Sequence, residues 1–181
     1  MAQPTQRRAL TGRWKIRNEW SESQAALLRT MGRPRWQVNV IDQAQEDFFL
    51  VVYDTDHVHK DVTISLNSTL LRMTNTDRVH YMHDLRMNNQ WHSHPDDEKG
   101  FGRCRSRGHW DDQQHQYHLD WELHNGRLRV IHYVDERDRL HCMLTFTHNN
   151  GRRASSRKVY QRVVYTPAQQ AYLATRENRT R

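Results

Sequence analysis

The sequence predicts an all-β protein, a ten-stranded antiparallel up-and-down β-barrel with a short helical lid between strands 1 and 2. Three observations support this fold class. Apolar and polar residues alternate along most of the chain, which is the period of a half-buried strand. Turn residues separate the alternating runs at short intervals, and one short segment near the N-terminus has helical periodicity instead. A meander of this length usually closes into a barrel, because closure removes exposed strand edges.

The clearest strand is the segment 114–124, in which four large apolar residues beginning at Tyr117 alternate with polar ones. Asn125-Gly126 follows it and is a strong signal for a two-residue hairpin turn. The same reasoning predicts ten strands, at residues 12–19, 36–43, 47–54, 59–66, 69–75, 78–86, 114–124, 127–134, 139–148 and 155–165.

The predicted helix runs from Glu22 to Met31, and Gly32 with Pro34 forms a suitable stop. Residues 87–112 are rich in Asn, Asp, Gly, Arg and His, and we interpret them as an inserted loop between the sixth and seventh strands. The predicted organisation is therefore a flexible basic arm (1–9), a barrel domain (10–165) and a short helix with a tail (166–181).

Composition narrows the class of protein. A chain of 181 residues with a net charge of +7 fits one domain that attracts anionic partners. No run reaches the ~18 apolar residues that a membrane helix needs, and no apolar run follows the first residues to make a secretory signal. Cys104 and Cys142 are too few for a disulfide framework. These features favour a cytoplasmic protein, and we expect a monomer.

The opening Gly12-x-Trp14, the helical segment ending in Met31-Gly32 and the simple strand order resemble the intracellular fatty-acid-binding protein family, as a divergent member of this calycin-type barrel. The likeness spans roughly residues 10–165 without the 87–112 insert. The secreted lipocalins also begin with Gly-x-Trp, but they lack the lid helices. Further local similarities lie at Leu27–Gly32, His59–Leu66 and Leu144–His148, followed by Lys158-Val159-Tyr160.

The resemblance implies a protein that holds a small hydrophobic or amphipathic ligand, such as a fatty acid or another lipid, in the barrel for transport. In that family the last strand carries Arg-x-Tyr, which holds the ligand carboxylate; Lys158-x-Tyr160 is the match here and keeps the charge without the planar fork. Tyr133 falls nearest the family's second interior arginine, and Arg157 is a neighbouring cation. The lid residues expected to gate access are Leu27, Leu28 and Met31.

Two other function classes stay open. Arg103, Arg105 and Arg107 lie between Phe101 and Trp110, and this mixture of cations and aromatic rings is typical of single-strand nucleic-acid binders. The same arginines would also suit an anionic membrane surface. The other class is a barrel enzyme of the luciferase-like kind, because the chain has 13 histidines and several of them fall on predicted strands.

The sequence contains no motif for catalysis or for a cofactor. His92-x-His94, Cys104 and His109 carry zinc-ligating groups, but their spacing matches no standard zinc site. We therefore predict no catalytic residue, no cofactor and no metal.

Overall fold

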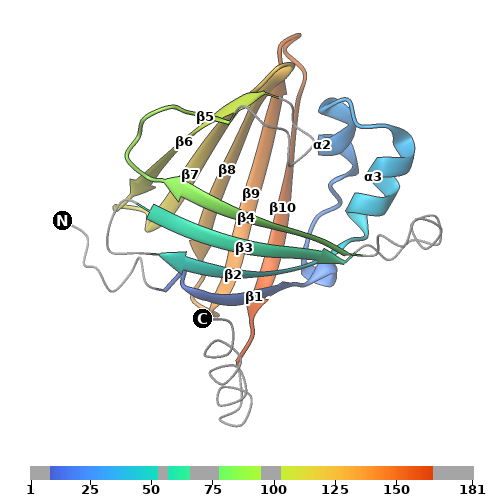
Figure 1. Ribbon diagram of the computed structural model, residues 1–181. Helices are drawn as coiled ribbons and strands as arrows, with labels where there is room; N and C mark the ends of the chain where they lie inside the picture. The colour runs from blue at the N-terminus through green and yellow to red at the C-terminus, as the bar shows by residue number, and fades with distance from the viewer. Residues whose placement is uncertain (1–8, 53–56, 66–77, 95–102, 165–181) are drawn as a thin grey trace.

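The computed structural model describes residues 9–52, 57–65, 78–94 and 103–164. Its ten strands form one antiparallel sheet in the order β4-β3-β2-β1-β10-β9-β8-β7-β6-β5 (Figure 1). Among the described strands, those that are consecutive in the chain pair with one another, except β4 and β5, and the first strand also pairs with the last. This arrangement confirms the predicted up-and-down topology. The strands are β1 (Gly12–Ile16), β2 (Gln45–Val52), β3 (His57–Ser65), β4 (Arg78–Arg86), β5 (His92–His94), β6 (Cys104–Asp111), β7 (Gln116–Leu123), β8 (Gly126–Val134), β9 (Arg139–His148) and β10 (Arg153–Arg162).

The two ends of the sheet meet by packing between β4 and β6. Among the described strands no ladder joins the two sheet edges, β4 and β5, but β4 contacts β6. Met87 follows β4, and its sulfur would lie 2.5 Å from a Cβ placed on Gly108 of β6. The Asn89 amide also donates to the Gly108 carbonyl at 2.8 Å. Because Gly108 has no side chain, the two halves of the sheet can approach here, and Figure 1 shows β1–β4 crossing in front of β6–β10.

Helical elements connect β1 to β2 and lie at one end of the barrel (Figure 1). α2 confirms the predicted helix and packs against β9 and β10. The Asn125 side chain, in the turn after β7, donates to the Met31 carbonyl at 2.9 Å and ties this helix to the rim. The elements are η1 (Asn18–Trp20), α2 (Ala25–Thr30) and α3 (Arg35–Asp42).

The prediction of a strand at residues 36–43 is wrong, because this segment forms most of α3. Val38 is buried, while Trp36, on the same face of the predicted strand, is 55% exposed. Val38 and Ile41 are three residues apart and so lie on one side of a helix. Pro34 occupies the N-cap, a place near a helix start where its missing N–H breaks no helical hydrogen bond. The lid is consequently a pair of helices.

The interpretation of residues 87–112 as an inserted loop is also wrong, because they contribute β5 and β6 to the sheet. The inward positions of β6 include Cys104, Ser106 and Gly108, which are small or polar. The strand therefore lacks the alternation of large apolar residues by which a half-buried strand is normally detected. The strand predicted at 69–75 and the helix and tail predicted at 166–181 lie outside the described residues, as does the arm predicted at 1–9 except for its last residue.

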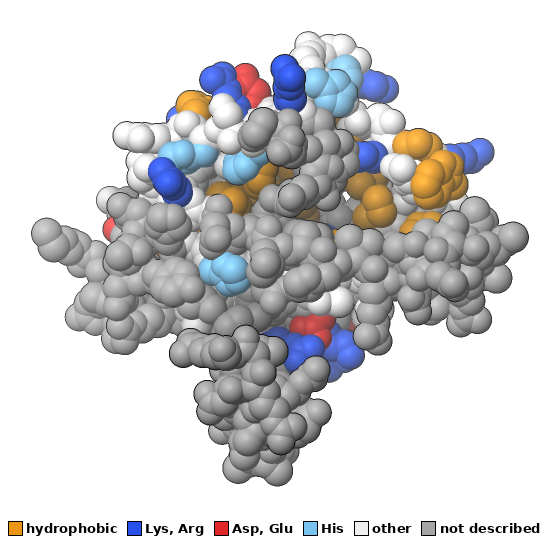
Figure 2. Space-filling model, viewed as in Figure 1, with side chains coloured by type: hydrophobic (Ala, Val, Ile, Leu, Met, Phe, Trp, Pro, Cys, Tyr) orange, Lys and Arg blue, Asp and Glu red, His pale blue; other side chains and the backbone are white. Residues whose placement is uncertain are grey.

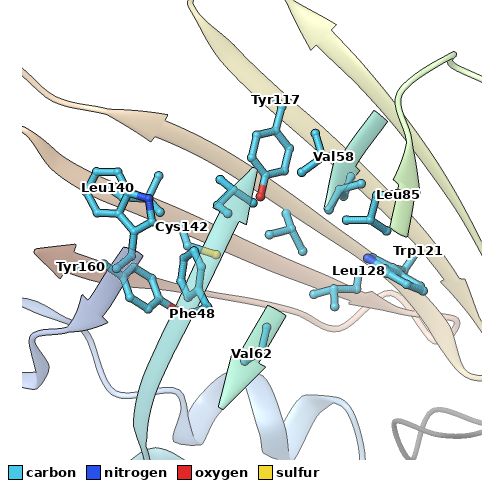
Figure 3. Packing of buried hydrophobic residues seen from close by; sticks show 14 of the residues in the cluster. Phe48, Val58, Val62, Leu85, Tyr117, Trp121, Leu128, Leu140, Cys142 and Tyr160 are labelled. Atoms are coloured by element: carbon cyan, nitrogen blue, oxygen red, sulfur yellow. The ribbon is translucent and has the colours of Figure 1, made fainter. Parts of the chain in front are cut away.

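The inner face of the sheet is a mostly apolar core, part of which Figure 3 shows. At one end the Arg162 guanidinium lies 4.1 Å from the centre of the Trp14 ring and donates to the Thr11 carbonyl. Gly12 has a φ of 151°, and a Cβ there would lie 2.4 Å from an Arg162 nitrogen. The opening Gly-x-Trp and the last basic strand thus meet at this end of the barrel.

Candidate functional site

A row of polar side chains crosses the inside of the barrel. Lys158 of β10 pairs with Cys142 of β9, which pairs with His132 of β8, which pairs with Tyr117 of β7. Directly opposed residues in a sheet point to the same face, and the neighbouring residues on this face belong to the buried core. Figure 3 shows Tyr117 and Cys142 projecting into the space that Phe48 also faces.

Two charged residues reach this row from β2 and β3. Lys158 Nζ donates to Glu46 Oε2 at 2.6 Å, and Lys60 Nζ lies 3.8 Å from Glu46 Oε1. The Tyr160 hydroxyl also hydrogen-bonds the Glu46 carboxylate. The exposed fractions of the Glu46, Lys60 and Lys158 side chains are only 7%, 13% and 15%. We call Glu46, Lys60 and Lys158 the inner charge cluster.

Glu46 and Lys158 keep each other charged at neutral pH. Burial by itself would raise the pKa of Glu46, but the charges of Lys158 and Lys60 outweigh burial and lower this pKa to about 2. Burial would lower the pKa of Lys158, and the Glu46 carboxylate raises it above its usual value instead. The inner charge cluster contains two lysines and one glutamate, so it carries a formal excess of +1.

The neighbouring titratable groups are neutral. Burial raises the pKa of Cys142 to about 11 and the pKa of Tyr117 well above its usual value. Burial also lowers the pKa of His132 well below its usual value, and both lysines add to this effect. The His132 and Tyr117 rings stack with centroids 4.2 Å apart. Within the described residues, the Tyr117 hydroxyl and both His132 ring nitrogens lack a hydrogen-bond partner. Buried polar atoms are usually bonded, so these atoms are suited to a group from a bound molecule.

The structure brings Lys158 and Tyr160 together and separates them from the other two predicted head-group residues. Arg157 lies on the outer face, with its guanidinium 3.9 Å from the Glu22 carboxylate. Tyr133 also lies on the outer face, where it stacks on His141. The inward residue at this part of β8 is its neighbour His132, which is opposite Cys142.

The three predicted lid residues all belong to the α2 region. Leu27, Leu28 and Met31 are buried, and Leu27 and Met31 join the main core cluster. Helix α2 therefore covers its end of the barrel with apolar side chains that also contribute to the core.

Sequence reasoning missed Glu46, Lys60, His132 and Tyr117 as functional residues, although strand periodicity contains the signal. Lys60 lies between Val58 and Val62 on one face of β3, and both valines are fully buried. Glu46 precedes Phe48 on the same face of β2. A charged residue on an otherwise apolar strand face is unusual, and it indicates a charge inside the barrel.

The outer face carries two polar rows, which we call the outer arginine rows. Cross-strand pairing aligns Arg105–Glu122–Arg127–Thr147–Arg153 in one row and Arg107–Asp120–Arg129–Thr145–Ser155 in the other. Arg107 and Arg129 donate to Asp120 at 2.9 and 2.8 Å. Arg105 lies against Glu122, and Trp91 lies 5.0 Å from the guanidinium carbons of both Arg105 and Arg107.

A groove of about 620 Å³ lies on the outer arginine rows, beside the β7–β8 and β9–β10 turns, and Arg127, Arg129 and Arg153 line it. Figure 2 shows further Lys, Arg and His side chains around the end of the molecule from which the β9–β10 turn projects. This region of the surface is therefore basic.

The histidines do not form a metal centre in the described part of the chain, where no three His, Cys, Asp or Glu side chains are placed to hold an ion. His94 and Cys104 are directly opposed in the sheet, and His94 Nε2 lies 2.7 Å from the Ser106 hydroxyl. His132 is buried inside the barrel, whereas His118 stacks on His109 on the outer face. None of the described helices has the length and apolar character to span a membrane.

Comparison with solved structures identifies the class of fold, which is the barrel of the fatty-acid-binding proteins. The fatty-acid-binding protein 1 of Echinococcus granulosus has a TM-score of 0.61 and 10% identity, and the match covers 86% of this chain and 98% of that protein. The wild-type fluorescent protein UnaG has a TM-score of 0.58 and 13% identity, covering 85% and 97%. A point mutant of UnaG has a TM-score of 0.60 at 13% identity, covering 87% and 98%.

These matches confirm the predicted fold, and the chain is a divergent barrel of the fatty-acid-binding-protein type. Neither a family model nor a curated protein matches the sequence. The function must therefore be argued from the residues inside and outside this barrel.

Proposed function

We propose that this protein binds a small amphipathic ligand inside the barrel and places its anionic head group in the inner charge cluster, at Lys158. The observation that carries the proposal is the formal excess of +1 in the inner charge cluster, whose side chains are almost fully buried. An uncompensated buried charge is strongly unfavourable, and an anionic head group would supply the counterion that the described residues do not. The apolar part of the ligand would contact the aliphatic and aromatic residues of the inner face.

Further contacts support the same ligand class. The Tyr117 hydroxyl and the His132 ring nitrogens lie on the same inner face as Lys158 and offer hydrogen bonds to a polar group. The helices over one end of the barrel bury Leu27, Leu28 and Met31, so we propose that movement of this lid gates access. The proposed role is that of a cytoplasmic carrier acting as a monomer. The Echinococcus protein with the same fold is named for fatty-acid binding, which supports the ligand class.

The test compares an anionic ligand with a neutral one. Purified protein is titrated with a fluorescent long-chain fatty acid and with the methyl ester of the same molecule. We expect Lys158→Ala to weaken binding of the acid by about tenfold or more, since a buried charge pair is lost, and to weaken binding of the ester much less. Lys15→Ala is the matched control, because Lys15 is exposed on β1. Equal losses for acid and ester would remove Lys158 from the site, and absence of binding to wild type would refute the proposal.

A second candidate function is binding of single-stranded nucleic acid on the outer arginine rows. Five arginines and two acidic residues lie in these rows, and this excess of positive charge extends across five strands. Trp91 lies beside Arg105 and Arg107 and offers an aromatic ring for base stacking. The groove lined by Arg127, Arg129 and Arg153 continues the same surface.

Salt dependence tests this second candidate. If the rows bind nucleic acid, the affinity for a labelled single-stranded oligonucleotide should fall steeply with salt, since phosphate contacts release counterions. Arg127→Ala with Arg129→Ala should reduce the slope by about one unit for each lost phosphate contact. Lys158→Ala should leave the slope unchanged. Binding to phosphatidylserine vesicles without binding to the oligonucleotide would assign the surface to membranes instead.

A further inference from the structure

A carboxylate of the protein already lies where the ligand head group is proposed to bind. Glu46 Oε2 accepts a hydrogen bond from Lys158 Nζ at 2.6 Å, and the Tyr160 hydroxyl bonds the same carboxylate. Lys158 and Tyr160 form the Lys-x-Tyr match of the last strand, which was predicted to hold a ligand carboxylate. In this structure both hold Glu46.

We propose that Glu46 is an internal competitor for Lys158 and that an anionic ligand binds by displacing it onto Lys60. This inference rests on the proposed ligand-binding function and deepens it by defining the charge of the ligand. The two oxygens of Glu46 already face different lysines, since Oε1 lies 3.8 Å from Lys60 Nζ. Glu46 would therefore exchange one of two existing contacts for the other, and Lys158 with Tyr160 would become available to the head group.

The exchange defines a singly charged anionic head group as the preferred ligand class. After displacement the site would contain Lys158 with the ligand and Lys60 with Glu46. A single negative charge on the ligand balances the excess of +1 in the cluster. A doubly charged head group would leave an unpaired negative charge in a buried site, which is unfavourable. A neutral head group would leave Glu46 in place and the excess positive charge uncompensated.

The other carboxylate near the cluster among the described residues, that of Asp42, does not remove this excess. Asp42, at the end of α3, contributes only the weakest of the attractions that raise the pKa of Lys158. Its own carboxylate accepts hydrogen bonds from the Ser23 hydroxyl and the Gln24 backbone amide. It therefore holds the two lid helices together, and the charge balance of the inner charge cluster depends on Glu46.

The experiment measures three fluorescent probes that share one alkyl chain, namely a fatty acid, its methyl ester and an alkyl phosphate monoester, whose head group carries about −1.5 to −2 at neutral pH. Wild type should prefer the fatty acid. Glu46→Gln should bind the fatty acid about tenfold tighter or more, because a competing charge is removed, and should gain still more affinity for the phosphate. The affinity for the ester should not change.

Glu122→Gln is the matched control, because Glu122 also lies on a strand between two cations, Arg105 and Arg127, but on the outer face. It should leave all three affinities unchanged. Unchanged or weaker fatty-acid binding by Glu46→Gln would overturn the competitor role, as would equal gains for the acid and the ester. Failure of wild type to bind any probe would instead refute the proposed function.

A double variant provides the same test if Glu46→Gln does not fold. Glu46→Gln with Lys60→Met removes one negative and one positive charge, so the cluster keeps its formal +1 while Lys158 loses its competitor. This variant should bind the fatty acid more tightly than wild type. Equal or weaker binding would show that Glu46 does not compete with the ligand, and the proposal would be wrong.

Discussion

The two faces of the barrel wall carry similar charged groups in different surroundings. On the inner face Glu46 lies between Lys158 and Lys60, at 2.6 and 3.8 Å. On the outer face Asp120 lies between Arg107 and Arg129, at 2.9 and 2.8 Å. The carboxylates are buried in both places, but the outer arginine side chains are 32% and 55% exposed. Water can therefore solvate the outer cations, whereas the inner lysines depend on Glu46.

Two stacked pairs of tyrosine and histidine repeat this contrast. Tyr117 stacks on His132 inside the barrel, and Tyr133 stacks on His141 outside. The outer pair is hydrogen-bonded through one ring nitrogen, because His141 Nε2 lies 2.9 Å from Asp135 Oδ2, while His141 Nδ1 has no partner among the described residues. The inner pair has no hydrogen-bond partner within the described residues for the Tyr117 hydroxyl or the His132 nitrogens.

Buried polar atoms without a partner among the described residues occur on both faces. The faces differ because water can reach the outer cations, while the inner charge cluster is almost fully buried and carries a formal excess of +1. An incomplete polar set in a buried place is costly, and a fold can maintain it where a bound molecule completes the set. This difference is why we assign the ligand to the inner face.

The largest expected effect is the loss of Glu46. Glu46→Gln should reduce the free energy of unfolding by about 3–5 kcal/mol, the usual cost of removing one partner from a buried ion pair. Glu122→Gln should cause a much smaller loss, because Arg105 and Arg127 on the outer face are more than half exposed. Urea denaturation of the ligand-free proteins measures both values. Similar losses for the two variants would show that water reaches the inner lysines and would remove the contrast between the faces.

The next effect is the pH dependence of the same residue. Because the pKa of Glu46 is lowered from 4.5 to about 2 in the folded state, its ionised form stabilises the protein above pH 4.5. That contribution should be lost as the pH falls from 4.5 to 2, and it amounts to about 3 kcal/mol. The difference in unfolding free energy between wild type and Glu46→Gln should therefore shrink over this range. Comparing the two proteins cancels the titrations they share, and a constant difference would contradict the prediction.

The sequence was sufficient to predict the strand order and the first lid helix, because the period of two is strong where large apolar residues alternate, as in β7. It failed where the inner residues are not large and apolar. Strand β6 places Ser106 and Gly108 inward, since Met87 fills the space beside Gly108. Helix α3 was mistaken for a strand, because Trp36, Val38 and Val40 occupy every second position, which is the spacing of one strand face. All three residues lie in the helix instead.

The candidate site was predictable in part. The likeness to a known ligand-binding strand identified Lys158 and Tyr160, but it could not identify Glu46 and Lys60, which come from β2 and β3. Glu46 and Lys60 lie close to Lys158 of β10 because the sheet is strongly curved. This curvature is a property of the whole barrel. Tyr133 and His132 differ by one position, and a shift of one residue in a strand exchanges the inner and outer faces.

The smallest expected effect concerns His132 and His141, the two histidines that are buried among the described residues. His132→Phe should leave the stability of the ligand-free protein unchanged or raise it by up to about 1 kcal/mol, because it removes buried nitrogens without partners and keeps an aromatic ring against Tyr117. His141→Phe should lower stability by about 1 kcal/mol, because Asp135 loses a hydrogen bond. Thermal or urea denaturation measures both. Equal destabilisation by the two variants would show that His132 is hydrogen-bonded in the empty barrel, and its nitrogens would then not be reserved for a ligand.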